Sequence, residues 1–164
     1  MSASSLARAA AVGALGVGLP YAAISLYWAL GGTWLLDTVS GSLAEQVRLG
    51  NVGPGVALAV FGAAILKLVG AVLPILSVQL SAAGAWHASL RALLWLEATV
   101  LIAYGLVLTV VGLLVQSGLI AAAPDADKRA LAWHAFLWDP WFLVWGALVA
   151  AYLLLTRRRE DSSV

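Results

Sequence analysis

Four long apolar stretches constrain the fold of this chain more than any other feature of its sequence. A helix needs roughly 20 mostly apolar residues to cross the hydrocarbon core of a membrane. The sequence offers four such stretches, at about residues 9–30, 56–80, 92–115 and 139–156. The pattern predicts an all-α, integral membrane four-helix bundle that forms one domain over residues 1–164.

The composition indicates that lipid is the solvent of this chain. Hydrophobic residues make up 63% of the sequence and charged residues only 10%. Eight acids and nine bases cannot cover the surface of a soluble domain of 164 residues. The net charge of +1 argues against nucleic acid as a partner, because duplex binding requires clustered basic residues. Cysteine is absent, which excludes disulfides and thiolate metal sites.

The basic residues near the ends of the spans predict the orientation. Five of them flank the membrane on the side of the termini and three on the opposite side: Arg8, Arg91 and Arg157 to Arg159 against Arg48, Lys128 and Arg129. This bias predicts that both termini lie in the cytoplasm and that the chain resides in the cell membrane. Residues 157–164 then form a cytoplasmic tail that is first basic and then acidic.

The start of the last span has two interpretations. Asp139 followed by Pro140 is typical of a helix start, so the span can begin there, with residues 124–138 as a separate short helix along the interface. The alternative is one kinked helix from about Ala130. We favour the break, because it keeps Asp139 out of deep lipid.

Two shorter patterns predict local structure. The sequence Ser42-Leu-Ala-Glu45 is a capping box and predicts a short helix in the first outer loop that ends at Gly50. Gly105 and Gly112 are seven residues apart and therefore share one face of the third span, which indicates a packing seam.

Three charged residues fall inside predicted spans, and each is a functional hypothesis because a charge in lipid is costly: Lys67, Glu97 and Asp139. Side chains lean toward the start of their own helix, so Lys67 and Glu97 should point apart. Asp139 is the better partner for Lys67, because we expect the two residues at a similar depth in the membrane. We expect a Lys67–Asp139 pair that either holds two helices together or belongs to a solute or proton site. Glu97 should reach the inner interface, near Arg91 or Arg157.

A second group of polar and aromatic residues is expected at the outer face, comprising Tyr27, Trp34, Asp37 and His134 beside Asp139. The chain has two histidines, and the predicted topology places His87 and His134 on opposite sides of the membrane. One metal ion cannot be bound by both across about 30 Å of hydrocarbon. The sequence therefore predicts no metal site and no cofactor.

Two motifs resemble a known family. The stretch Tyr27-Trp-Ala-Leu-Gly-Gly-Thr-Trp34 and the segment Leu137-Trp-Asp-Pro-Trp-Phe142 before a final apolar span are similar to the bacterial small four-helix membrane proteins of domain of unknown function 3995. The resemblance covers most of the chain in its span layout. It implies an integral membrane protein and no catalytic activity.

Three functions are compatible with these patterns. The small number of polar residues that could carry chemistry favours a non-enzymatic membrane component. Such a component would contact the lipid bilayer and either form a homo-oligomer or bind another membrane protein. The first alternative is a small-solute or ion carrier that works as an oligomer, with Lys67 and Asp139 in its path. The second is a membrane-embedded redox or other enzyme subunit that uses the outer-face residues.

Overall fold

The computed structural model describes residues 2–79 and 85–160, and the regular elements in these two ranges are all helical. Four helices are long and apolar enough to cross a membrane. They are α1 (Ala3–Ala29), α3 (Pro54–Gln79), α4 (Ala85–Gln116) and a segment, Lys128–Arg157, that includes most of α6 (Asp139–Glu160). The predicted all-α, four-helix membrane class is confirmed.

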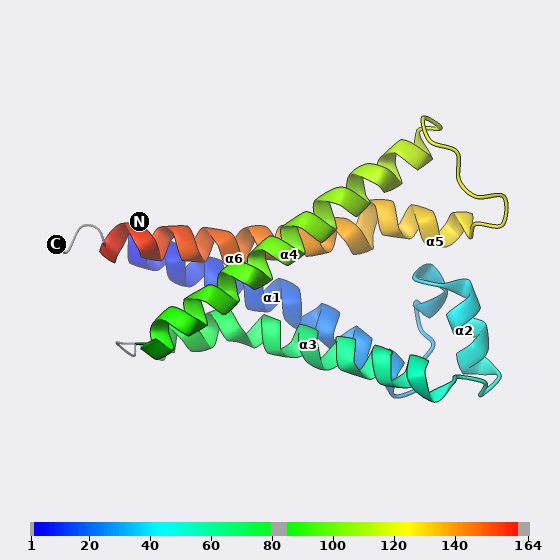
Figure 1. Ribbon diagram of the computed structural model, residues 1–164, viewed down its shortest axis with the longest axis horizontal. Helices are drawn as coiled ribbons and strands as arrows, with labels where there is room; N and C mark the ends of the chain where they lie inside the picture. The colour runs from blue at the N-terminus through cyan, green and yellow to red at the C-terminus, as the bar shows by residue number, and fades with distance from the viewer. Residues whose placement is uncertain (1, 80–84, 161–164) are drawn as a thin grey trace.

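The four long helices form two pairs that meet along α1 and α6. Helix α3 packs on α1, α4 crosses α6, and α1 and α6 pack on each other, whereas α3 and α4 have few mutual contacts. Figure 1 shows that α3 and α4 lie together at one end of the molecule and diverge toward the other. We call the first of these ends, which also carries both termini, the terminal end, and the other end, which carries α2 and α5, the loop end (Figure 1).

The core of the terminal end is built from small and branched side chains. Ala11 and Ala14 of α1, Leu94 of α4, and Val149 and Leu153 of α6 are completely buried in one hydrophobic cluster. Alanine permits close approach of two backbones, which drives association where lipid removes the hydrophobic gain between helices. The terminal end is therefore held mainly by close packing.

Glycines shape the crossing of α4 and α6. A Cβ atom added to Gly105 would collide with the backbone of Leu143, and one added to Gly112 would lie 2.9 Å from the Cβ of Ala135. Gly146 faces α4 in the same way, with the Cβ of Leu101 at 2.8 Å. The predicted packing seam at Gly105 and Gly112 is confirmed, and its partner is α6 with the residues just before it.

The loop end begins with a short turn, η1 (Leu36–Thr38), and the helix α2 (Gly41–Arg48). The predicted short helix is present, but it starts earlier than the capping box indicated, because Ser40 rather than Ser42 accepts a hydrogen bond from the N–H of Leu43. The helix ends just before Gly50, as expected. Gly50 has a φ of 67°, a left-handed conformation that glycine adopts without strain.

The last span is continuous with the helix before it, so the favoured break at Asp139 is wrong. Helix α5 (Lys128–Trp133) runs directly into the π-helical turn η2 (His134–Trp138) and then into α6. Single π turns commonly bend helices. Asp139 does not need to end the helix, because it finds a polar partner in His134 five residues earlier. The alternative of one bent helix describes this region, and its start at Lys128 lies close to the expected Ala130.

Candidate functional site

Lys67 lies midway along α3 and contacts α1. Its Nζ atom donates a hydrogen bond to Oγ of Ser25 over 2.8 Å. The same atom lies 4.2 Å from the ring centre of Tyr21 and 5.6 Å from that of Phe142. A cation over an aromatic face is attracted by the negative charge of the ring face. Lys67 is thus held by a hydroxyl group and two rings.

The expected Lys67–Asp139 pair is not formed. Asp139 contacts His134 instead, and the Lys67 ammonium group lies over Tyr21. Lys67 and Asp139 were expected to pair because of their similar depth, but the sequence does not specify which side chains lie between two helices. The other expectation for Lys67 is confirmed, because Ser25 lies near the loop end of α1 and Lys67 therefore leans toward the start of α3.

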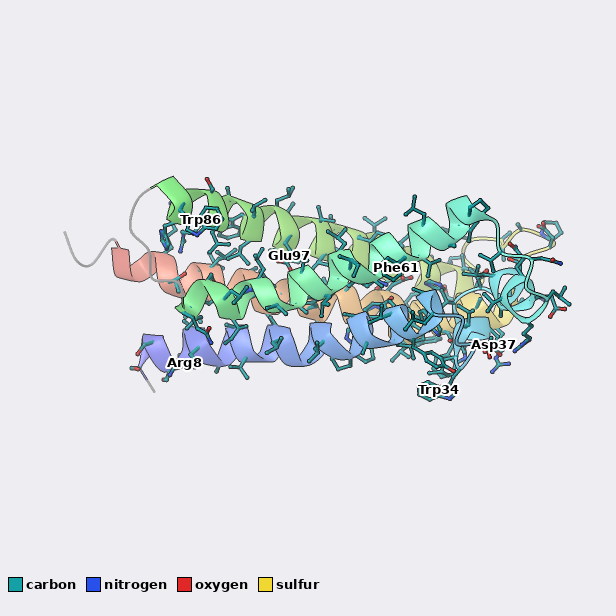
Figure 2. All side chains as sticks on the ribbon, turned by 90° about the horizontal axis from the view of Figure 1, so that it is seen from below. Arg8, Trp34, Asp37, Phe61, Trp86 and Glu97 are labelled. Atoms are coloured by element: carbon teal, nitrogen blue, oxygen red, sulfur yellow. The ribbon has the colours of Figure 1, made fainter. Side chains whose placement is uncertain are left out.

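Glu97 lies on α4, where this helix faces α3 (Figure 2). A Cβ atom on Gly70 of α3 would come within 2.9 Å of Glu97 Oε1. Both carboxyl oxygens are buried and have no hydrogen-bond partner. The expected contact with Arg91 or Arg157 is not formed. Arg91 donates to Oγ1 of Thr156 over 3.0 Å. Burying a carboxyl group without a hydrogen-bond partner is costly, so Glu97 is expected to destabilise the contact between α3 and α4.

His134 and Asp139 form a polar clip at the loop end. The Nδ1 atom of His134 lies 3.0 Å from Oδ1 of Asp139, whose residue is only 3% exposed. The other ring nitrogen, Nε2, lies 3.2 Å from the carbonyl oxygen of Val39. Close by, Nε1 of Trp138 donates to Oγ1 of Thr38 over 3.2 Å. These bonds tie the π turn to the segment around η1.

The structure does not bring the outer-face residues together into one site. Tyr27 and Trp34 are exposed, with 45% and 66% of their surface accessible. Asp37 pairs with Arg129 at 2.9 Å, while His134 pairs with Asp139. Figure 2 shows Trp34 and Asp37 together at the loop end. All four residues belong to the loop end, but their side chains have different partners.

Asp127 joins the two short elements of the loop end. As the N-cap of α5, its Oδ1 atom accepts from the N–H of Arg129 at 3.0 Å and of Ala130 at 3.1 Å. The other carboxylate oxygen lies close to Gly41, the first residue of α2. Backbone hydrogen bonds, with that of Ala130 first, hold the pKa of Asp127 below its usual range.

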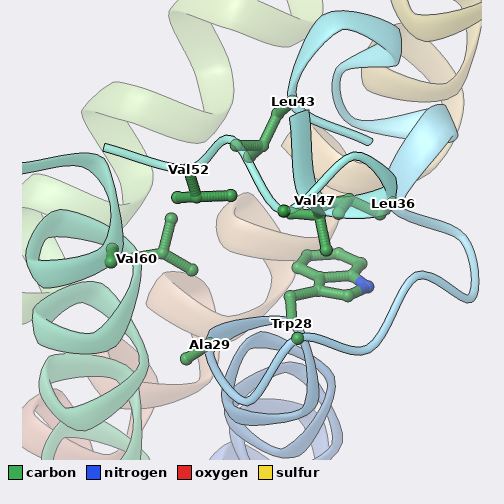
Figure 3. Close-up of a pocket in the computed structure, with 10 residues that line it drawn as sticks. Trp28, Ala29, Leu36, Leu43, Val47, Val52 and Val60 are labelled. Carbon is green, nitrogen blue, oxygen red and sulfur yellow. The ribbon is translucent and has the colours of Figure 1, made fainter. Parts of the chain in front are cut away.

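A cavity of about 200 Å³ lies beneath α2, and sequence reasoning missed it. Figure 3 shows its side chains converging from the end of α1, from α2 and from the start of α3. The spacing of Leu43 and Val47, four residues apart on a short helix, is the sequence signal for an apolar face there. Lining residues include Trp28, Leu36, Leu43, Val47, Val52 and Val60.

The described residues contain no group of three His, Asp or Glu side chains that could hold a metal ion. His87 lies near the start of α4 at the terminal end, whereas His134 lies in η2 at the loop end. The predicted separation of the two histidines is confirmed.

Comparison with known proteins identifies a family. No curated protein matches the chain, and no solved structure matches it. The model of one family, described as protein of unknown function (DUF3995), matches residues 18–149, a region that runs from the middle of α1 into α6. This match covers most of the chain, and its range includes the residues of both motifs. The four long apolar helices indicate a multi-pass membrane protein, and the match places it in a family: the protein belongs to the DUF3995 family, described as proteins of unknown function.

Proposed function

We propose that this chain is a non-enzymatic membrane component that receives a transmembrane helix of another membrane protein between α3 and α4. The observation that carries the proposal is Lys67, a partly exposed residue midway along a candidate membrane span. Its ammonium group forms no ion pair with a described carboxylate. A lysine has three N–H donors, and Ser25 uses one of them. The others suit an acceptor supplied from outside the chain.

The energetic cost of a lysine inside a membrane span supports this proposal. A charged lysine at the centre of a membrane helix costs roughly 2.5–3.5 kcal/mol on insertion scales. One hydroxyl group and the ring faces of Tyr21 and Phe142 offset part of this cost. A carboxylate on a partner helix would offset the remainder. We therefore expect the partner to carry an acidic or strongly polar residue at mid-depth.

The open side of the bundle fits a helix. Only 11% of the apolar window of α3 and 17% of that of α4 is buried, against 33% for each of the other two spans. Gly62, Leu66 and Gly70 lie four residues apart and therefore near one face of α3. Gly70 meets Glu97 of α4, but Gly62 has open space around it, because α4 has moved away there. The two glycines of this face permit close helix contact on either side of Leu66.

A second copy of the chain is a weaker candidate for the partner. The acids inside its own spans are Glu97 and Asp139, and the described structure encloses both. A homo-oligomer would therefore present no carboxylate to Lys67 without rearrangement. A different protein with an accessible acidic residue is favoured.

Carriage of a small anion is a second candidate function, and the side-by-side Lys67 and Ser25 favour it. An ammonium group and a hydroxyl group 2.8 Å apart can both donate to a carboxylate or an inorganic anion. The same residue thus supports both candidates, and the experiment must separate them.

Photocrosslinking in native membranes tests the proposal. A photoreactive amino acid replaces Leu66, which is 74% exposed and adjacent to Lys67, or Val12 of α1, which is 51% exposed and serves as the control. We expect an adduct with a transmembrane peptide of another protein from position 66 and not from position 12, and we expect Lys67→Met to abolish it. The crosslinked peptide should contain an acidic or strongly polar residue.

Other outcomes contradict the proposal. An adduct with a second copy of the chain would replace the foreign partner with a homo-oligomer. If position 66 reacts with lipid alone, and if anion uptake into proteoliposomes is lost in Lys67→Met, the chain is a carrier instead.

A further inference from the structure

We propose that the cavity beneath α2 binds one acyl chain of a membrane phospholipid. The cavity lies at the loop end, away from Lys67, and is independent of the proposed partner helix. Its volume is about 200 Å³. An apolar cavity of about 150 Å³ already accommodates a benzene-sized hydrocarbon, so this one can hold a short stretch of alkyl chain.

The chemistry of the walls selects an apolar occupant. Side chains around the cavity are aliphatic except for Trp28 (Figure 3). The single polar side-chain atom among them, Nε1 of Trp28, is already used in a 2.8 Å hydrogen bond to the carbonyl oxygen of Trp34. An ordered water molecule needs two to four polar partners, which these side chains do not offer. Backbone atoms add a minor polar part to the lining, but most of its surface is apolar, which favours hydrocarbon over water.

The surroundings identify this hydrocarbon as lipid. Ala57 and Val60 line the cavity from the first turns of α3. Beside them on the same helix, Val56, Leu58 and Phe61 are exposed, with 41%, 74% and 44% of their surface accessible. The cavity wall is thus continuous with a helix surface that faces the membrane. Acyl chains are the neighbouring molecules of such a surface, and one of them can enter without crossing water.

The cavity is preformed rather than opened by its ligand. Trp28 is only 7% exposed, and its bond to Trp34 fixes the chain beyond α1. Ser40 caps α2, and Leu36 and Ala44 are buried beneath it in the same cluster as Trp28. A cavity with fixed walls binds its ligand at a smaller entropic cost than a flexible one.

Retention through detergent washing distinguishes a bound acyl chain from the surrounding lipid. Membranes that contain the full-length protein are loaded with a phospholipid carrying a diazirine on its acyl chain. The protein is then extracted, washed in mild detergent, irradiated and digested for peptide mass spectrometry. We expect adducts at Val52, Ala57 or Val60, and none at Val107 or Val111 of α4, which are exposed but line no described cavity.

A cavity-filling variant provides the decisive comparison. Val60→Trp should reduce the retained label roughly tenfold, a loss of about 1.4 kcal/mol of binding. Leu58→Trp, two residues away on the exposed surface, should leave the label unchanged. Circular dichroism checks that each variant is folded, and Ala57→Phe replaces Val60→Trp if the latter is not.

Two results would overturn the proposal. One is equal labelling of the cavity residues and of the α4 surface after washing, which would indicate lipid around the whole bundle. The other is label that survives in a folded Val60→Trp or Ala57→Phe variant.

Discussion

The terminal end and the loop end of this bundle are stabilised by different interactions. At the terminal end, fully buried Ala11, Ala14 and Leu153 let the helices pack closely. At the loop end, Tyr21 stacks on Trp138 with ring centres 5.5 Å apart, and the Trp138 indole donates to Thr38. Regular helices satisfy their own backbone groups, so the terminal end relies mainly on close packing, with a few side-chain hydrogen bonds such as that of Arg91 to Thr156. Non-helical segments must find external partners, and the loop end supplies them from side chains.

We expect the largest loss of stability from a substitution that disturbs close packing where the terminal end and the loop end meet. Gly105→Val would push α4 away from the backbone of Leu143, which cannot yield as a side chain can. Overpacking typically costs about 1–3 kcal/mol, and we expect the upper part of this range or loss of the fold. Gly62→Val is the matched control, because nothing lies within 4 Å of Gly62. Thermal unfolding in detergent measures the stability of both variants. Equal stability of the two variants would show that the crossing is not held by close contact.

We expect a smaller loss of stability from substitutions that remove side-chain hydrogen bonds at the loop end. Asp139→Leu or His134→Leu alone leaves the other member of a buried polar pair without its partner, at a cost of roughly 1–3 kcal/mol. The double variant should cost clearly less than the sum of the two. Combining Lys67→Met with Asp139→Leu should give more nearly additive effects, because these two residues share no bond. Strong coupling of Lys67 with Asp139, and none of His134 with Asp139, would reverse our assignment of partners.

The smallest effect concerns Asp127 and pH. Because its pKa is lower in the folded chain than in the unfolded chain, Asp127 stabilises the loop end above the unfolded value of about 4 and loses this contribution as the pH falls below it. Asp127→Asn should therefore remove a small part of the acid sensitivity of unfolding. The comparison is between unfolding curves of parent and variant at neutral and acidic pH. Identical pH dependence in the two proteins would show that the bonds from Arg129 and Ala130 to Asp127 do not contribute.

The sequence predicted the spans well because length and apolarity are local properties. Each predicted span overlaps one long helix, and the seam at Gly105 and Gly112 follows from spacing along one helix. The break at Asp139 was wrong for a reason that local rules do not contain. His134 and Asp139 are five residues apart and would lie on different sides of a regular α-helix. The π turn η2 lies between them in the sequence, and their side chains meet across it.

The candidate site was less predictable because it depends on lateral neighbours. The lean of Lys67 toward the start of its helix follows from the direction of the Cα–Cβ bond, and the structure agrees. Its actual neighbours, Ser25 and Tyr21, come from α1, and no pattern in the sequence specifies how α1 and α3 are rotated against each other. The cavity beneath α2 escaped prediction for the same reason, since its walls come from three separate segments.

The position of His134 between two oxygen atoms also determines how many protons this region holds. The carbonyl of Val39 can only accept, so Nε2 of His134 must carry a hydrogen. The contact between Nδ1 and Asp139 then requires one further proton, on either the ring or the carboxyl group. In both arrangements the charges of the two residues sum to zero. The helix therefore carries an aspartate through a candidate membrane span without adding a net charge.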